Sequence, residues 1–133
     1  MQNLSEIVKQ WPVVNGWSVA PKAFPFCKKG NRLIVLGNWA KVGNGAKIGN
    51  EATIGDAAKI GDWATDPINL GFADGFSVHL AQVGGVAFIG GGCKWLNIED
   101  AIAYVTGRPE RAEMLDRVLY AATIADRKGW RRS

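Results

Sequence analysis

The chain has 133 residues, of which 47% are hydrophobic and 21% are charged, and its formal net charge is +4. These values are typical of one globular domain, and the positive charge favours anionic partners such as phosphates, nucleotides or nucleic acid, unless it only forms a solvated basic surface. The first residues lack the pattern of a signal peptide, and the longest apolar run is too short to span a bilayer. We therefore expect a soluble, cytoplasmic protein without a membrane partner.

The cysteine and histidine content limits the chemistry. Cys27 and Cys93 belong to no metal-binding or redox motif, so we expect two buried, reduced thiols, with a disulfide as the alternative. His79 is the single histidine, which excludes a zinc site built from three histidines. We predict no metal.

Residues 1–35 are predicted to form a cap made of a short helix and hairpins. Asn3 is a suitable N-cap for a helix that stops at Pro12. Asn15 and Gly16 lie between β-forming residues and predict a first hairpin, and a second is predicted around residues 30–31.

Lys28, Lys29 and Arg32 crowd around the second of these turns. Like charges are tolerable at a hairpin tip because solvent screens them. The cluster is therefore either a solvated tip or part of an anion-binding site.

A six-residue repeat occupies residues 36–65. Each unit starts with an aliphatic residue and glycine, has Asn or Asp at its third position, and has alanine at its fifth. A period of six matches no helix, and each interior glycine would cost a helix about 1 kcal/mol relative to alanine. Gly, Asn and Asp tolerate left-handed φ angles and predict corners, between which side chains alternate inward and outward. The first positions are Leu36, Val42, Ile48, Ile54 and Ile60.

This pattern resembles the hexapeptide-repeat superfamily. The resemblance implies a short left-handed parallel β-helix of triangular section, in which three units make one coil and residues 18 apart stack. So short a solenoid exposes its ends, so we expect caps and, from the habit of the family, a homo-oligomer such as a trimer. The pairs expected to stack are Lys41 with Lys59, Val42 with Ile60, and Asn44 with Asp62.

Residues 66–96 are predicted to form a β-hairpin extension. The repeat breaks at Asp66 and Pro67, and two strands are expected to meet in a turn at Gly84 and Gly85. The glycine run at 90–92 is not a phosphate-binding loop, because the required lysine motif is absent. We interpret these glycines as allowing close chain packing or a tight turn.

Residues 97–133 are predicted to form a helical tail. Asn97 is expected to cap a helix that stops at Gly107, and Pro109 is expected to open a last helix that Gly129 closes. The basic end of the chain is expected to fray. The apolar stripe of the last helix comprises Met114, Leu115, Val118, Leu119, Ala122 and Ala125. The predicted fold class is thus mainly β with C-terminal helices, in one domain: a short left-handed parallel β-helix flanked by hairpins and capped by an amphipathic helix.

His79 is the candidate catalytic residue only if the protein is an enzyme. Hexapeptide-repeat proteins are most often acyltransferases that use acetyl-CoA and a histidine base, so the resemblance implies that role for His79. Alternation along its strand places Val78 and Leu80 on one face and His79 on the other, at the solvent side or an interface. We prefer this second interpretation.

Basic and aromatic side chains are expected on the outside of the repeat. They could form a stacking platform for nucleic acid, but acidic and threonine residues interrupt the basic stripe, so nucleic acid is not the expected partner. These side chains are Trp39, Lys41, Lys47, Lys59 and Trp63.

Our preferred hypothesis is a non-enzymatic, homo-oligomeric binding protein that needs no cofactor and sequesters an anionic small molecule such as a nucleotide signal. The alternatives are a small acyltransferase using acetyl-CoA, and an inhibitor of a partner protein or a structural module. The segment from residue 90 onward also resembles small bacteriophage proteins with similar repeats, which implies an anti-defence role. The candidate ligand-binding residues are Lys28, Lys29, Arg32, Trp39, Lys41, Lys47, Lys59, Trp63 and His79.

Overall fold

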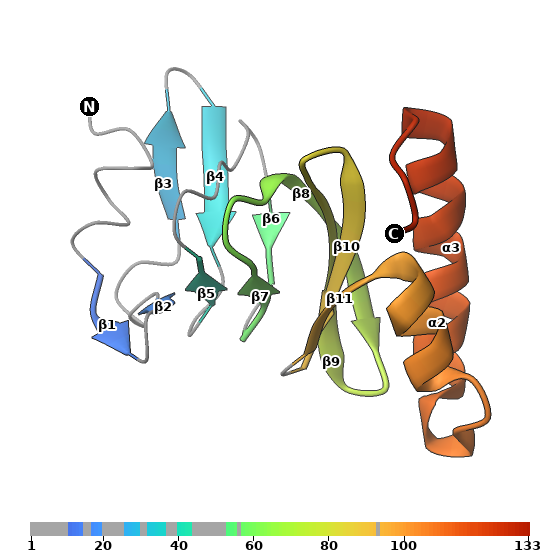
Figure 1. The fold of residues 1–133 in the computed structure, drawn as a ribbon. Coiled ribbons are helices and arrows are strands. Elements are labelled where there is room, and N and C mark those ends of the chain that lie inside the picture. Colours follow the sequence, from blue (N-terminus) through green and yellow to red (C-terminus); the bar gives the residue numbers. More distant parts are fainter. Residues whose placement is uncertain are drawn as a thin grey trace.

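The computed structural model describes residues 11–14, 17–19, 26–29, 32–36, 40–43, 53–55, 57–92 and 94–133. These residues form three layers, with short strands of the N-terminal half on one side, an antiparallel sheet in the middle and two helices on the other side (Figure 1). The helices lie at the C-terminal end, as the sequence predicts, but the fold combines sheets and helices and is not mainly β. No helix among the described residues is both long and apolar enough to cross a membrane.

Both hairpins expected near the N-terminus are present. Strand β1 (Val13–Val14) pairs with β2 (Trp17–Val19), and β3 (Phe26–Lys29) pairs with β4 (Arg32–Leu36), each pair antiparallel. The predicted helix before Pro12 lies outside the described residues, apart from Trp11, which is buried.

The repeat region confirms the predicted spacing of 18 residues. Strand β5 (Lys41–Val42) lies parallel to β7 (Lys59–Ile60), with Lys41 opposite Lys59 and Val42 opposite Ile60. Strand β4 lies parallel to β6 (Thr53–Ile54) in the same register, residue 35 opposite 53. The predicted stacking of Asn44 on Asp62 lies outside the described residues.

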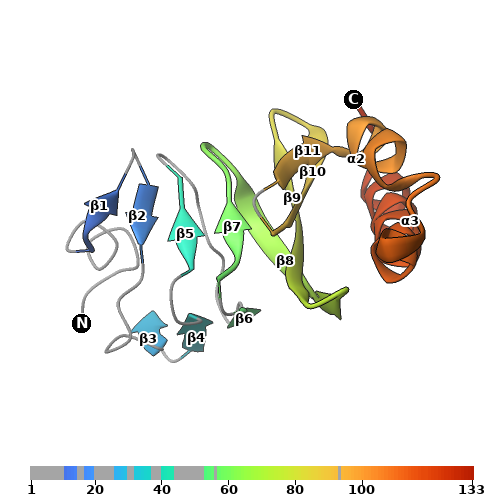
Figure 2. The same ribbon diagram turned by 90° about the horizontal axis from the view of Figure 1, so that it is seen from below.

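The described repeat strands belong to two separate sheets, ordered β1-β2-β5-β7 and β3-β4-β6. Figure 2 shows them as two rows that face one another. A closed parallel β-helix is not shown by the described residues. The alternation within the repeat is nevertheless as predicted: aliphatic and alanine side chains are buried, namely Ala40, Val42, Ile54, Ala58, Ile60 and Ala64.

The role expected for the repeat glycines is wrong at the three positions that the structure describes. Gly43, Gly55 and Gly61 are not in the left-handed region, whereas Ala57 and Trp63, at the fourth position of their units, have φ values of 56° and 61°. A Cβ atom at Gly61 would collide with the indole of Trp95, and one at Gly43 would collide with the backbone of Asp62. These glycines therefore serve close approach rather than the corner conformation.

The middle layer is a sheet ordered β11-β10-β9-β8. Its strands are β8 (Thr65–Ala73), β9 (Phe76–Val83), β10 (Val86–Gly91) and β11 (Lys94–Asn97). The turn at Gly84 and Gly85 joins β9 to β10 as predicted, because Val83 pairs with Val86. The sequence analysis did not predict β8 and β11 as strands.

The last layer consists of α2 (Ile98–Val105), a 3-10 turn η1 (Pro109–Arg111) and α3 (Ala112–Lys128). The Asn97 side chain accepts a hydrogen bond from the Asp100 N–H over 2.8 Å, which confirms the predicted cap. Gly129 ends α3 with a left-handed φ of 75°, as expected. The stripe of α3 is buried at Met114, Val118, Ala122 and Ala125, while Leu119 is 47% exposed and Ala121 is buried in its place.

The end of the chain is not frayed, contrary to the prediction. The Arg131 N–H donates to the Gly85 carbonyl and the Ala87 N–H donates to the Arg131 carbonyl, each over 2.8 Å. Arg132 also forms an ion pair with Asp126 at 2.8 Å. Backbone pairing with the β9–β10 turn therefore holds the terminal segment against the sheet.

Candidate functional site

His79 lies inside the molecule. Its exposed fraction is 0%, and its Nε2 accepts a hydrogen bond from the Gly55 N–H over 3.2 Å. The expected position on the solvent side is wrong because the repeat covers one face of β9 and the helices cover the other (Figure 1). The lone pair of Nε2 already accepts this hydrogen bond. Nε2 therefore cannot accept a proton from a substrate, as a general base must.

The candidate residues of the repeat are only partly brought together. Lys41 is exposed and Lys59 half-buried, on adjacent parallel strands. Trp63 is 67% exposed, at a corner. Trp39 and Lys47 lie outside the described residues, as does Cys93.

Of the hairpin β3–β4, which carries Lys28, Lys29 and Arg32, the structure describes only the backbone. Lys29 pairs with Arg32, so the two residues flank the turn as predicted. The side chains of Lys28, Lys29 and Arg32, and that of Cys27 on the same strand β3, fall outside what the structure describes.

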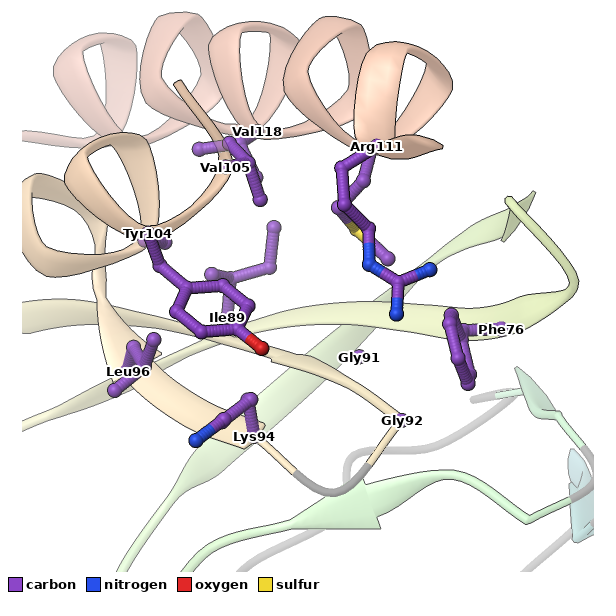
Figure 3. Close-up of a pocket in the computed structure, with 12 residues that line it drawn as sticks. Phe76, Ile89, Gly91, Gly92, Lys94, Leu96, Tyr104, Val105, Arg111 and Val118 are labelled. Carbon is purple, nitrogen blue, oxygen red and sulfur yellow. The ribbon is translucent and has the colours of Figure 1, made fainter. Parts of the chain in front are cut away.

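A different site lies between the antiparallel sheet and the helices. It is a cavity of about 90 Å³ that opens to solvent. Figure 3 shows Tyr104 on one side of the opening, Arg111 and Phe76 on the other, and the chain at Gly91 and Gly92 along its base. The deeper walls are apolar and come from β10, β11, α2 and α3: Ile89, Leu96, Ala101, Val105, Met114 and Val118.

Two cations, Lys94 and Arg111, line the cavity, and a third, Arg108, contacts the Tyr104 ring beside it. The Lys94 ammonium lies 5.0 Å from the centre of the Tyr104 ring, and the Arg108 guanidinium carbon lies 4.6 Å from it. The Arg111 guanidinium carbon lies 4.7 Å from the centre of the Phe76 ring. These contacts position the cations by cation–π attraction while leaving their charges uncompensated.

Carboxylates do not neutralise this site. Among the described residues, none of the three cations is in an ion pair, and the side chains of Arg111 and Tyr104 have no hydrogen-bond partner. The neighbouring carboxylate, Asp74, instead accepts a hydrogen bond from the Met114 N–H over 2.8 Å, at the beginning of α3. The opening therefore offers a guanidinium and a hydroxyl for an incoming anion.

Local structure fixes these groups. Pro109 starts the 3-10 turn that carries Arg111 to the start of α3, and the Arg108 Nε–H donates to the Tyr104 carbonyl over 2.6 Å. Gly92 has a left-handed φ of 61°, and a Cβ atom there would contact the Phe76 ring at 3.0 Å. The glycine run at 90–92 thus allows close packing, as the sequence analysis expected, and it also forms the base of the cavity.

The sequence analysis did not predict this site. Lys94, Tyr104 and Arg111 are far from the repeat in sequence and follow no known motif. The one signal in the sequence is the glycine run before "CKW", which indicates close chain packing or a tight turn but not a cavity beside it.

Titration shifts occur away from the cavity. The hydrogen bond from Arg132 lowers the pKa of the Asp126 carboxyl below its ordinary value of 3.8, and Asp126 raises the pKa of Arg132 in return. The described residues contain no cluster of three or more His, Cys, Asp or Glu that could hold a metal ion.

Comparison of this chain with protein-family models, with curated proteins and with solved structures found no match.

Proposed function

We propose that the protein is a non-enzymatic binding protein that sequesters an anionic small molecule in the cavity between the sheet and the helices. The observation that carries this proposal is a pair of polar groups at the mouth of an apolar cavity, the Arg111 guanidinium and the Tyr104 hydroxyl, which have no hydrogen-bond partner among the described residues. Apolar walls with a few convergent polar groups are typical of ligand sites. Lys94 and Arg108 add positive charge that attracts an anion.

The placement of His79 favours binding over acyl transfer. A histidine base must reach an acceptor hydroxyl or amine, and His79 is fully buried with Nε2 engaged by Gly55. No histidine lines the cavity, since the single histidine of the chain, His79, lies against Gly55 of the repeat. We therefore place acetyl-CoA chemistry second to sequestration.

We further propose that residues 36–65 form a short left-handed β-helix and that the protein is a homo-oligomer, such as a trimer. The 18-residue register of both parallel pairs supports the first proposal. Exposed Val13 on β1 and Trp63 at a corner support the second, because large apolar side chains at the surface are suited to contacts between copies.

Native mass spectrometry tests the binding proposal. The protein is measured alone and with acetyl-CoA, cyclic AMP, AMP, hexanoate and benzoate, and the same spectra give the number of copies. We expect at least one anion to be retained intact, retention to be lost in Arg111→Gln, and no change in Lys28→Gln.

Other results of this experiment would contradict either the proposed cavity or the proposal of sequestration. Loss of retention in Lys28→Gln but not in Arg111→Gln would move the site to the charged hairpin and contradict the proposed cavity. Consumption of acetyl-CoA, or retention of none of the anions, would overturn the proposal of sequestration.

A further inference from the structure

The size of the cavity limits its ligand. A volume of about 90 Å³ holds at most about six to nine water-sized positions, so the part of a ligand inside it has no more than about that many non-hydrogen atoms. A nucleotide is far larger, and most of it would remain outside the apolar walls. The enclosed part of the ligand is therefore a short chain or a single ring.

The residues that line the cavity favour a ligand whose enclosed part is apolar. Ile89, Val105 and Val118 face the cavity, and Met114 lies beside the base, where its Cε would be 3.0 Å from a Cβ atom at Gly91. Burying hydrocarbon against such walls is favourable by about 25 cal/mol per Å² of apolar surface. A polar body would lose its hydrogen bonds to water without replacement.

The polar groups at the opening favour a ligand whose charged group is a small planar anion. Among the described residues, Arg111 is the one guanidinium that lines the cavity; Lys94 also lines it, with its ammonium over the Tyr104 ring, and Arg108 contacts that ring without lining the cavity. A guanidinium matches a carboxylate with two parallel hydrogen bonds, and the Tyr104 hydroxyl can donate a third. A single arginine with one hydroxyl suits a single negative charge better than the double charge of a phosphate monoester.

We infer that the ligand of this cavity is a monocarboxylate with a short alkyl chain or one aromatic ring, its carboxylate held by Arg111 and Tyr104. This inference rests on the proposed binding function and narrows its ligand from anions in general to one chemical class. The apolar body lies between Ile89, Val105 and Val118, and the carboxylate stays at the solvent side.

Isothermal titration calorimetry with benzoate and hexanoate tests the inference. Comparison ligands are benzamide, which keeps the shape and removes the charge, phenyl phosphate, which changes the anion, and AMP, which exceeds the cavity. We expect benzoate or hexanoate to bind about ten-fold or more tightly than benzamide, because hydrogen bonds to charged groups are the stronger ones. Phenyl phosphate and AMP should bind more weakly than the carboxylates.

Variants locate the binding. Arg111→Gln should weaken carboxylate binding about ten-fold or more, whereas Arg127→Gln, an exposed change near the other end of α3, should leave it unchanged. If Arg111→Gln does not fold, Tyr104→Phe removes only the hydroxyl and should weaken binding by several-fold.

The results distinguish failure of the inferred ligand class from failure of the proposed binding function. Tighter binding of AMP or phenyl phosphate than of the carboxylates, lost in Arg111→Gln, would overturn the ligand class and leave the binding function intact. Absence of binding by every anion would overturn both. Equal effects of Arg111→Gln and Arg127→Gln would show that the carboxylate responds to net charge rather than to this cavity.

Discussion

Glycine residues in the repeat strands differ from those in the sheet-and-helix half. Gly43 and Gly61 have φ values outside the left-handed region and leave no room for a Cβ atom. Gly75 and Gly129 have φ values of 81° and 75°, with nothing within 4 Å of a Cβ atom. Glycine thus provides close approach at Gly43 and Gly61 and backbone conformation at Gly75 and Gly129, and Gly90 on β10 belongs with the first group although it lies in the other half.

The largest loss of stability is expected at His79, where the repeat packs against the antiparallel sheet. His79→Ala leaves a cavity at a fully buried position and removes the acceptor of the Gly55 N–H. We expect the free energy of unfolding to fall by about 2–5 kcal/mol, measured by urea denaturation. Thr123→Ala, on the exposed side of α3, is the control and should change it by less than about 0.5 kcal/mol. Equal stability of His79→Ala and the control would contradict the packing of the repeat on the sheet.

Substitution at glycine separates its two roles. A Cβ atom at Gly90 would collide with the Lys59 carbonyl and the Trp95 ring. Gly90→Ala should therefore lower the free energy of unfolding by about 1–3 kcal/mol through overpacking. Gly75→Ala should cost about 1–2 kcal/mol from its left-handed φ alone.

Asparagine then distinguishes the two positions. Because Asn tolerates a left-handed φ, Gly75→Asn should recover much of the loss, whereas Gly90→Asn should be worse than Gly90→Ala. Thermal unfolding of the four variants checks this order. A recovery at position 90 would mean that conformation rather than space requires glycine there.

A smaller effect is expected at a corner of the repeat. Ala57 has a φ of 56°, so Ala57→Gly relieves about 1–2 kcal/mol of strain and loses about 0.5–1 kcal/mol to chain entropy. The expected result is unchanged stability or a gain of up to about 1.5 kcal/mol. Ala58→Gly, at a buried neighbour without a left-handed φ, should instead destabilise the protein. Similar losses in both variants would refute the left-handed corner.

The smallest effect concerns the ion pair of the terminal segment. The pKa of Asp126 is lowered in the folded state, so its contribution to stability is present above the ordinary value of 3.8 and is lost as the pH falls through the folded pKa. Asp126→Asn should therefore be slightly less stable than the parent at pH 7 and equal to it in strong acid. Because both side chains are exposed, 1 M NaCl should also shrink the difference at pH 7. A difference that persists in acid would exclude the ion pair as its source.

Local signals predicted much of the fold correctly. Two-residue turns, the Asn97 cap and the Gly129 stop depend on neighbours in the sequence, so their residue types identify them. The 18-residue register followed from the period of the repeat together with its family resemblance. By contrast, β8 begins at Thr65 and includes Pro67, and its pairing with β9 is irregular, so it lacks the alternation that marks a strand.

Contacts between distant segments were not predictable. His79 was expected at the surface because alternation shows which residues share a face, but not whether a second layer covers that face. The cavity joins residues from β9 to α3, and its polar groups are available to a ligand because none of the lining residues is a carboxylate and no described carboxylate pairs with them. Nothing in the sequence near Arg111 or Tyr104 indicates that absence.

The burial of β9 on both faces has a consequence for motion. Residues Val78, His79, Leu80 and Ala81 are all fully buried, and β9 pairs with β8 on one side and β10 on the other. Opening this strand to water requires both outer layers to separate from it. Its amide hydrogens should therefore exchange with deuterated solvent most slowly, at the rate of global unfolding. The two halves, although built on different sequence patterns, would then lose their structure as one cooperative unit.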